Sequence, residues 1–422
     1  MNQALNVEVN FPPATDGHIA VVNLKSARAQ FWSRFWQAPE RSGIAECLVE
    51  QEHLAAQFLG DLDAFNRLET LVCEFARVDA EPIRTALIHA QVASMSHRFA
   101  EARSYLAQAE DQGAPPAAVK RLALGIDQAC GTGIEAVLEA RYGMAAESGR
   151  LEDLVPLGAL LADLREFDQA NAIYSQALRA YQDVSPFALA WVCFQLGALW
   201  GELVPDTQPI RAAQWYRRAI DYLPCYVKAR VHLAEIYSQD GRTDDAEVLL
   251  MPAIASGDPE VSWRLADVLN ASGRSAEAEV QMQAARSGFE ALLQRHWLAF
   301  ADHGAEFYAG SGNDGRRALA LALVNLANRP TLRASERAYS AAVGVGETHV
   351  AREILAAAAN RWGWTGAFRL SPLAAYRAES ARSDAGSSAS SATTRPNADE
   401  ARGGLTFSRI DDVHAKSLGA IT

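Results

Sequence analysis

Long apolar runs, paired cysteines and a secretion signal are all missing from this sequence. No stretch of about 18 apolar residues occurs, so we expect no membrane-spanning helix. The first residues, MNQALNVEVNFPP, lack the basic start and apolar run of a secretory signal. The cysteines are odd in number, lie far apart and form no C-x-x-C pair, so we expect buried free thiols and a cytoplasmic location. The five are Cys47, Cys73, Cys130, Cys193 and Cys225.

Positive charge is also scarce. The chain has 39 Lys and Arg against 51 Asp and Glu, a formal net charge of −12. Nucleic-acid binding needs a basic stripe that displaces counterions from the phosphate backbone, so we expect no nucleic-acid partner. The segment GTGIEA, residues 131–136, resembles a glycine-rich dinucleotide turn, but the residues before it have the pattern of a helix instead of the required strand. We therefore expect no cofactor.

Motifs for catalysis are missing as well, including the G-x-S-x-G nucleophile pattern and the H-E-x-x-H zinc pattern. One cluster of possible metal ligands occurs, in HWLAFADHGAEF, residues 296–307, where His296, His303 and Glu306 could approach one face of a predicted helix. A catalytic zinc needs three protein ligands and an open position. We interpret the three residues as a polar patch and expect no enzyme. A metal-dependent or other enzyme that uses them stays as an alternative.

The feature that the sequence does have is a periodic pattern of small and aromatic residues. In AAQWYRRAIDYLP, residues 212–224, Ala212, Tyr216 and Ala219 fall on one helical face, and Pro224 ends the helix. The two alanines leave room for a neighbouring helix, and the ring fills the gap between them. The pattern recurs with a period close to 34 residues. Its first positions are Ala102, Ala136, Ala170, Ala212, Ala246, Ala278, Ala318 and Ala351.

An earlier helix precedes each of these markers, and glycine or asparagine often marks the turn between the two. Gly158, Gly197 and Ala234 are small residues on this earlier helix. We expect them to allow the first helix of each pair to touch the second. The chain should therefore form a series of tightly packed helix pairs.

These residues resemble the tetratricopeptide repeat family, and in particular a bacterial-type scaffold of this kind. Its consensus places Leu-Gly and Tyr on the first helix, then Ala, an aromatic, Ala and Pro on the second. The resemblance implies an all-α, right-handed solenoid of about eight or nine helix pairs that acts as a protein-interaction scaffold. The best matches are residues 151–184, 190–224 and 227–258. Diverged repeats are expected at 83–116, 117–150, 261–290, 297–330 and 333–360, with a degenerate one at 44–76.

The two ends of the chain differ from this repeat region, residues 44–377. Residues 1–43 are predicted to form a cap, in which residues 1–25, with their β-prone run from His18 to Leu24, are irregular. The aromatic segment at residues 27–37 is expected to be a helix that covers the first repeat. Residues 378–422 are rich in Ser, Ala and Gly and are predicted to be a disordered tail. Its last part, LTFSRIDDVHAKSLGAIT, regains apolar residues that could fold on a partner or on the protein's own groove.

The resemblance also implies a binding site, because members of the family hold peptides along the concave groove. The inner positions carry mostly aromatic side chains, which serve equally in hydrophobic cores and in binding sites. The basic clamp that chaperone-binding members use is missing. We therefore expect a protein or peptide partner, of which a peptide or a helical segment binds in the groove, with self-assembly into a homo-oligomer or structural array as an alternative. The predicted groove residues are Trp191, Phe194, Lys228, Trp263, Phe300, His303 and Phe307.

Overall fold

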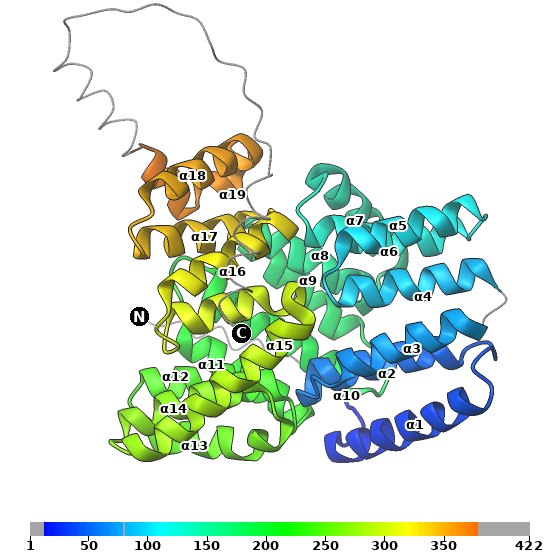
Figure 1. Cartoon of the computed structure of the whole chain (residues 1–422), viewed down its shortest axis with the longest axis horizontal. Coiled ribbons are helices and arrows are strands. Elements are labelled where there is room, and N and C mark those ends of the chain that lie inside the picture. The colour runs from blue at the N-terminus through cyan, green and yellow to red at the C-terminus, as the bar shows by residue number, and fades with distance from the viewer. Residues whose placement is uncertain (1–11, 79–80, 379–422) are drawn as a thin grey trace, which may run out of the picture. The chain divides into compact units, whose positions relative to one another are not determined.

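The computed structural model describes residues 12–78 and 81–378, and it divides the chain into one unit up to Ala374 and a second from Ala375 onward. All regular elements in these described residues are helical (Figure 1). Consecutive helices of the first unit pack against their neighbours, as the predicted all-α solenoid requires. The predicted tail lies outside the described residues, apart from its first residue.

The chain's first described helix, α1, extends over Gly17–Gln37. The Asp16 side chain caps it by accepting hydrogen bonds from the backbone N–H groups of His18 (2.9 Å) and Ile19 (3.1 Å). The expectation of an irregular, β-prone segment from His18 to Leu24 is therefore wrong, because the cap starts a helix whose inner face buries Leu24 and Phe35. This helix packs against α2.

The repeats are helix pairs joined by short turns, and their bounds match the predicted periodicity closely. The first three pairs are α2 (Ile44–Leu59) with α3 (Ala64–Val78), α4 (Pro82–Met95) with α5 (Phe99–Asp111), and α6 (Pro116–Ala129) with α7 (Ile134–Ser148). The next three are α8 (Leu151–Asp163) with α9 (Phe167–Ala180), α10 (Pro186–Ala198) with α11 (Pro209–Tyr222), and α12 (Val227–Gln239) with α13 (Thr243–Leu250). Then follow α14 (Pro259–Ala271), α15 (Ser275–Ala309), α16 (Gly315–Asn328), α17 (Leu332–Gly344), α18 (Thr348–Trp362) and the short α19 (Gly366–Arg369).

Small residues on the first helix of a pair do touch the aromatic residue of the second. A Cβ atom added at Gly158 would lie 2.7 Å from Cε1 of Tyr174, and one at Gly197 would lie 2.5 Å from Cε1 of Tyr216. Real Cβ atoms do not approach other atoms so closely, so a larger residue at either position would force the ring or the helix to shift. The predicted reason for the small residues is confirmed.

The predicted register is wrong in one repeat. The pattern places Ala136, and with it Gly143 seven residues later, on the inner face of their helix, but both are exposed in α7. The buried side chains of this helix include Val137 and Arg141 instead. The turn explains the difference, because α7 begins at Ile134, two residues before Ala136, whereas α9 begins at Phe167, three residues before Ala170. The buried position therefore falls on Val137.

The predicted repeats at 261–290 and 297–330 meet within a single element, α15, without a loop between them. Its backbone leaves the helical region at His296 (φ −132°, ψ 44°), so that the element consists of two helices joined at a kink. The element packs against both α14 and α16, and α14 also contacts the part after His296, through Trp263 and Phe307. The boundary between these two repeats is therefore the kink alone, in place of a loop.

Helices far apart in the sequence also meet within the first unit. Arg361 on α18 donates to the carbonyl of Gly131, 2.8 Å away, and Asn328 donates to the carbonyl of His97, 2.9 Å away. The guanidinium of Arg165 forms an ion pair with Glu336 on α17. These contacts join later repeats to earlier ones within the first unit.

One segment has a property that the sequence search did not predict. Pro186–Leu203 is long and apolar enough to cross a membrane by length and composition alone, but 56% of this window is buried inside the structure. A core helix passes the same test, and α10 indeed packs against α9 and α11. The cysteines are free, as expected, although only Cys130 and Cys193 are buried and Cys73 is exposed.

Candidate functional site

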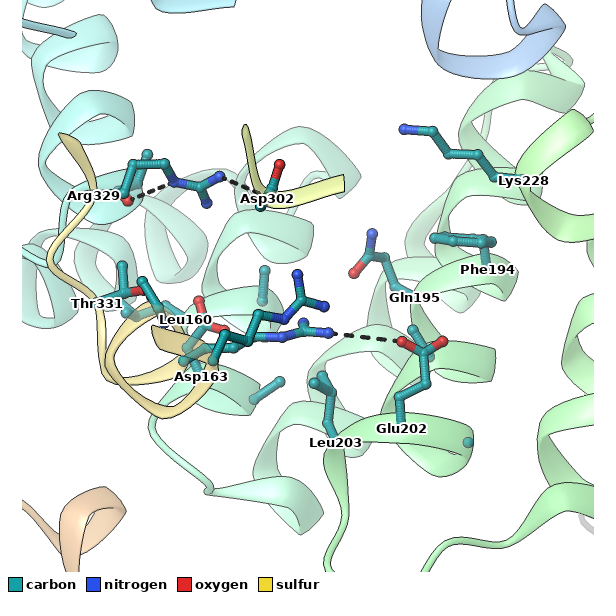
Figure 2. Close-up of a pocket in the computed structure, with 18 of the residues that line it drawn as sticks. Leu160, Asp163, Phe194, Gln195, Glu202, Leu203, Lys228, Asp302, Arg329 and Thr331 are labelled. Carbon is teal, nitrogen blue, oxygen red and sulfur yellow. Dashed lines mark hydrogen bonds and ion pairs between the residues drawn. The ribbon is translucent and has the colours of Figure 1, made fainter. Parts of the chain in front are cut away.

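A cavity of about 800 Å³, which we call the central cavity, lies among the repeats of the first unit (Figure 2). Its walls come mostly from the first helix of each pair. The lining residues extend from Gln57 on α2, through the inner faces of α6, α8, α10, α12 and α14, to α15 and α17. This placement agrees with the expectation that functional residues lie on the inner face of the solenoid.

A π-helical turn shapes one wall of the cavity. Residues Leu199–Leu203 continue α10 with five-residue hydrogen bonding, and Glu202 lies in this turn. Such π-turns are rare and often occur at functional sites. Here the wider turn brings the Glu202 carboxylate to the cavity wall, where it meets side chains from α11 and α12.

Glu202 forms a close charged contact and a hydrogen bond on this wall. One of its carboxylate oxygens, Oε1, lies 2.8 Å from Nδ1 of His232 and accepts a hydrogen bond of the same length from the Tyr216 hydroxyl. Burial opposes charge on His232, but attraction and hydrogen bonding to Glu202, with help from Glu235, raise its pKa to about 9. Burial also opposes charge on Glu202, yet His232, Tyr216 and Arg333 lower its pKa to about 2. The pair is therefore ionised at neutral pH.

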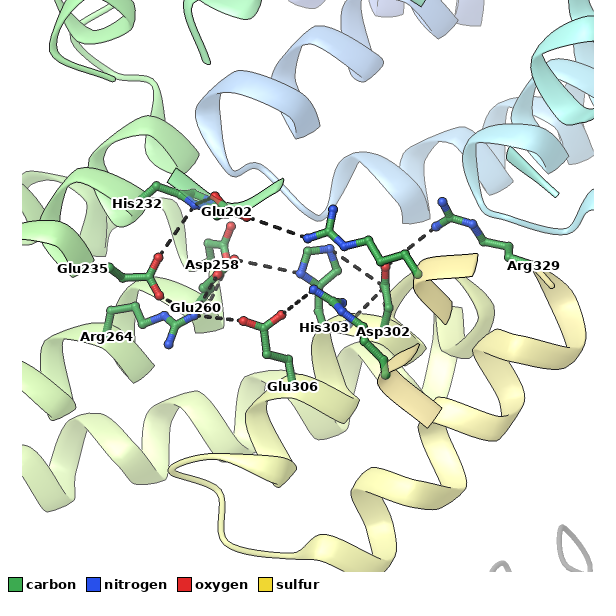
Figure 3. A network of polar contacts seen from close by, with 12 residues as sticks. Glu202, His232, Glu235, Asp258, Glu260, Arg264, Asp302, His303, Glu306 and Arg329 are labelled. Atoms are coloured by element: carbon green, nitrogen blue, oxygen red, sulfur yellow. Dashed lines mark hydrogen bonds and ion pairs between the residues drawn. The ribbon is translucent and has the colours of Figure 1, made fainter. Parts of the chain in front are cut away.

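A network of charged side chains continues from this pair across the cavity wall (Figure 3). Arg264 on α14 lies 2.6 Å from Glu235 and 3.2 Å from Glu306, and Arg337 on α17 lies 3.1 Å from Glu306. Burial raises the pKa of Glu235 to about 7, although Arg264 and His232 act against this. Arg264 and Glu306 thus connect four helices, α12, α14, α15 and α17.

The opposite part of the wall has looser ion pairs. Arg329 lies 3.7 Å from Asp302, and Arg333 lies 3.8 Å from Glu202. His303 lies 4.0 Å from both Asp302 and Glu260. These separations are longer than a hydrogen bond, so the guanidinium groups keep donors for other ligands.

Charge on the cavity wall is balanced, in contrast to the acidic chain as a whole. Six Lys or Arg residues and six Asp or Glu residues line the cavity. Nearly all of the carboxylates have a cationic partner within 4.0 Å. Three charged wall residues have no ion pair in the part of the chain that the structure describes. These are Lys228, Asp163 and Arg141, whose guanidinium donates a hydrogen bond to Gln128 instead. Figure 2 shows Lys228 and Asp163 on different sides of the cavity.

Four of the seven predicted groove residues line the central cavity. These are Trp191, Phe194, Lys228 and His303. The rings of Trp191 and Phe194 are stacked at a centroid distance of 6.1 Å, and they supply the apolar part of the wall. Their role in binding stays a prediction.

The other three predicted groove residues do not lie on the cavity wall. Phe307 is fully buried and its ring lies 5.4 Å from that of Trp263, while Phe300 packs against Phe65 at 5.2 Å. Sequence counting places Trp263 on the inner face, but α14 turns its neighbour Arg264 to the cavity instead. The assignment of these three rings to the groove is corrected, because they form core between helices.

The candidate metal ligands do not converge. Nε2 of His296 lies 2.9 Å from the Asn66 side chain, at the kink of α15 and away from the cavity. His303 and Glu306 do line the cavity, but Glu306 is paired with two arginines. Within residues 12–78 and 81–378, the structure has no group of three or more His, Cys, Asp or Glu residues that could hold a metal ion. The kink at His296 removes the helical spacing on which the alternative depends.

Sequence reasoning missed most of the charged residues of the cavity wall. Glu202, His232 and Arg264 lie on helices that were correctly predicted, but no spacing rule assigns them to one site. A signal did exist for His232, because it follows Lys228 by four residues and so shares its helical face. The π-turn that presents Glu202 has no comparable sequence signature.

Comparison with known proteins gives a distant likeness of fold. No family model matches the chain, and no curated protein matches it either. Among solved structures, the chain is similar to one described as "Crystal structure of APC/C hetero-tetramer Cut9-Hcn1", with a TM-score of 0.40 and 12% sequence identity. The alignment covers 78% of this chain and 62% of the other, so the chain spans less than two thirds of that protein. The expected bacterial type stays a prediction.

Proposed function

We propose that the repeat region, residues 44–377, is a protein-interaction scaffold that holds a short segment of a partner protein in the central cavity. One observation carries this proposal: the inner faces of successive repeats line a single cavity of about 800 Å³ with both charged and aromatic side chains. This volume is within the range of ligand-binding pockets. A cytoplasmic location and the alternative of self-assembly stay predictions from the sequence.

The contacts between early and late repeats favour a short occupant. Arg361 with Gly131, Asn328 with His97, and Arg165 with Glu336 connect helices that an open groove would keep apart. A long helix lying along the repeats would have to break these contacts. A loop or chain end of a partner needs only the space of the cavity itself.

The wall offers two kinds of contact to such a segment. Trp191 and Phe194 present stacked rings, and buried aromatic surface is the commonest source of binding energy at interfaces. Lys228, Arg329 and Arg333 present cationic groups that are unpaired or loosely paired. An occupant that carries both apolar and polar side chains would use both.

The experiment is peptide selection with a variant in which the cavity is filled. A displayed library of random peptides is selected on the full chain, on Ala198→Trp and on Ala284→Trp. Ala198 lines the cavity, so a tryptophan there fills part of it, while Ala284 is exposed outside the cavity and serves as the matched control. Circular dichroism checks that all three proteins keep their helical content.

The proposal expects peptides that are enriched on the full chain and on Ala284→Trp but not on Ala198→Trp. If the same peptides are enriched on all three proteins, or if none is enriched on any, the cavity is not a peptide-binding site and the proposal fails.

A further inference from the structure

One ion pair reaches across the central cavity. Arg333 is the second residue of α17, and its guanidinium lies 3.8 Å from the carboxylate of Glu202, which belongs to the π-helical turn after α10. Both residues line the cavity, and Figure 2 shows their contact as the dashed line that ends at Glu202. This side-chain contact, which we call the Arg333 bridge, occupies space that a bound segment would need.

The Arg333 bridge is weak by its geometry. Its separation is longer than a hydrogen bond, and the side chain of Arg333 is 48% exposed. Glu202 already has other partners, since it lies 2.8 Å from His232 and accepts a hydrogen bond from Tyr216. Partly exposed ion pairs contribute little energy, so the guanidinium can leave Glu202 at a small cost.

A second carboxylate, that of Asp163, lies near the start of α17. Asp163 is the last residue of α8 and has no ion pair in the part of the chain that the structure describes. Arg165, two residues later, forms an ion pair with Glu336 of α17. Glu336 is one helical turn after Arg333, so this pair holds the end of α8 close to the Arg333 side chain. The charge of Arg333 does act on the Asp163 carboxylate.

Asp163 needs a cation more than Glu202 does. Its carboxylate is at the C-terminal end of a helix, where the helix dipole disfavours negative charge. Asp163 is exposed to the space of the cavity, yet the helices around that space remove much of its water. This raises the pKa of its carboxyl although Arg333 and Arg329 act to lower it. The partners of Glu202 outweigh the same cost and lower its pKa to about 2.

We propose that Arg333 is a gate of the central cavity, with a closed state in which it bridges to Glu202 and an open state in which it pairs with Asp163. The proposal rests on the proposed function, because it assigns the control of access to the same cavity. Figure 2 shows Asp163 and Glu202 on different sides of the cavity, so the two acceptors define two discrete positions for one side chain. A segment that enters the cavity favours the open position, because the bridge occupies the same space.

The helix that carries Arg333 can stay in place while the side chain moves. α17 packs against α16 and α18, and Leu332, directly before Arg333, is buried. Arg337, one turn further along α17, donates a hydrogen bond of 3.1 Å to Glu306. Opening therefore needs only a change of side-chain rotamer, which is fast for an exposed residue.

The test measures how fast a bulky reagent reaches the cavity. Ala198 lies on the cavity wall four residues before Glu202, and Ala198→Cys is treated with N-pyrenylmaleimide or with the small N-methylmaleimide. Both reagents are uncharged and react by the same chemistry, so the ratio of their rates reports access that depends on size. Mass spectrometry measures the modification at position 198, and the exposed native Cys73 is the internal reference.

Four variants are compared in the Ala198→Cys chain. Arg333→Gln removes the bridge, Asp163→Asn removes the acceptor of the open state, and a double variant carries both changes. Arg352→Gln is the matched control, because Arg352 is exposed on α18 and does not line the cavity. Circular dichroism checks that all of them keep their helical content.

We expect Arg333→Gln to raise the ratio of the pyrenyl rate to the methyl rate about two- to fivefold, the effect of one partly exposed ion pair. Asp163→Asn should lower the ratio by a similar factor, because the open state loses its acceptor. Arg352→Gln should leave the ratio unchanged, and Asp163→Asn should have no effect where Arg333 is already replaced. Residues that only stabilise the fold would not change the ratio in opposite directions.

The gate is wrong if Arg333→Gln leaves the ratio unchanged, if Asp163→Asn raises it or leaves it unchanged, or if Asp163→Asn acts equally with and without Arg333. Each of these results leaves the proposed function standing, because the peptide selection with Ala198→Trp tests that function by itself. Failure of the selection would overturn the cavity as a peptide-binding site, while the ratio of rates would still decide whether Arg333 moves.

Discussion

The ring of Tyr216 lies directly against the backbone of Gly197, so that a Cβ atom at residue 197 would be 2.5 Å from Cε1 of the ring. Gly197→Ala should therefore destabilise the protein by about 1–3 kcal/mol, because either the ring or the helix must shift. Urea unfolding followed by circular dichroism measures the change.

Gly143→Ala is the matched control for this substitution. Gly143 lies inside α7, and a Cβ atom there would meet nothing within 4 Å. Alanine in a helix interior is favoured over glycine by roughly 0.5–1 kcal/mol, so this variant should be unchanged or more stable. Equal losses for both variants would show that the close contact at Gly197 is not the cause.

The helix pairs could be predicted because each one leaves a local signal in the sequence. Gly197 and Tyr216 belong to a pattern that recurs at nearly constant spacing, and such spacing reports contacts between neighbouring helices. The signal failed at two places, where a helix begins elsewhere than the pattern indicates. α7 begins only two residues before Ala136, and α1 begins within a run of β-prone residues, where Asp16 caps it.

The candidate site could be predicted only in part, for a physical reason. The central cavity depends on how the repeats coil, and the contacts that decide this join residues about 170 to 230 positions apart, as in Arg165 with Glu336 and Arg361 with Gly131. Two of these contacts go to backbone carbonyls, which have no sequence signature. Counting positions therefore placed Trp191 and Phe194 on the cavity wall, where the structure has them. The same counting could not show that Trp263 belongs to the core instead.

The core position of Phe307 predicts a large effect on stability. Its ring is fully buried and stacks on Phe289 at a centroid distance of 4.8 Å. Phe307→Ala should lose about 3–5 kcal/mol, because it leaves a cavity among packed rings. Trp191→Ala should cost less, because Trp191 is only half-buried at the cavity wall. Chemical denaturation compares the two, and a larger loss for Trp191→Ala would contradict their assignment to wall and core.

The ion pair between Arg165 and Glu336 joins distant repeats, and a double-mutant cycle measures it. Burial raises the pKa of Glu336 although Arg165 acts to lower it. The attraction to Arg165 therefore does not fully offset the cost of removing the carboxylate from water. We nevertheless expect a coupling energy of about 1–3 kcal/mol between Arg165→Ala and Glu336→Ala, because both side chains are mostly buried. Additive effects of the two substitutions would mean that the contact does not hold the repeats together.

The contact of Glu202 with His232 predicts a dependence of stability on pH. The pKa of His232 rises from about 6.5 to about 9 in the folded protein, so its contribution is complete below pH 6.5 and is lost as the pH rises through 9. Glu202 has a pKa of about 2, so its contribution is lost only as the pH falls below about 4.5. Between these limits the pair stabilises the fold.

His232→Gln isolates the alkaline part of this effect. The full chain should lose on the order of 1–3 kcal/mol more than the variant between pH 7 and pH 10. Thermal unfolding of both proteins over this range measures the change in stability. Subtracting the change in the variant from that in the full chain removes the contribution of other groups that titrate near pH 10. Parallel pH profiles for the two proteins would show that His232 is not charged in the folded state.

The central claim is that the central cavity holds a segment of a partner protein. Cross-linking a bound peptide to a residue of the cavity wall tests it most directly. A photo-reactive amino acid replaces Gln195, which lies on the cavity wall, or Ala284, which is exposed elsewhere on the first unit. A peptide selected on the full chain is then added and irradiated, and mass spectrometry identifies the products. The account predicts that the peptide is cross-linked from position 195 and not from position 284. A peptide that binds but is cross-linked only from position 284 would contradict it.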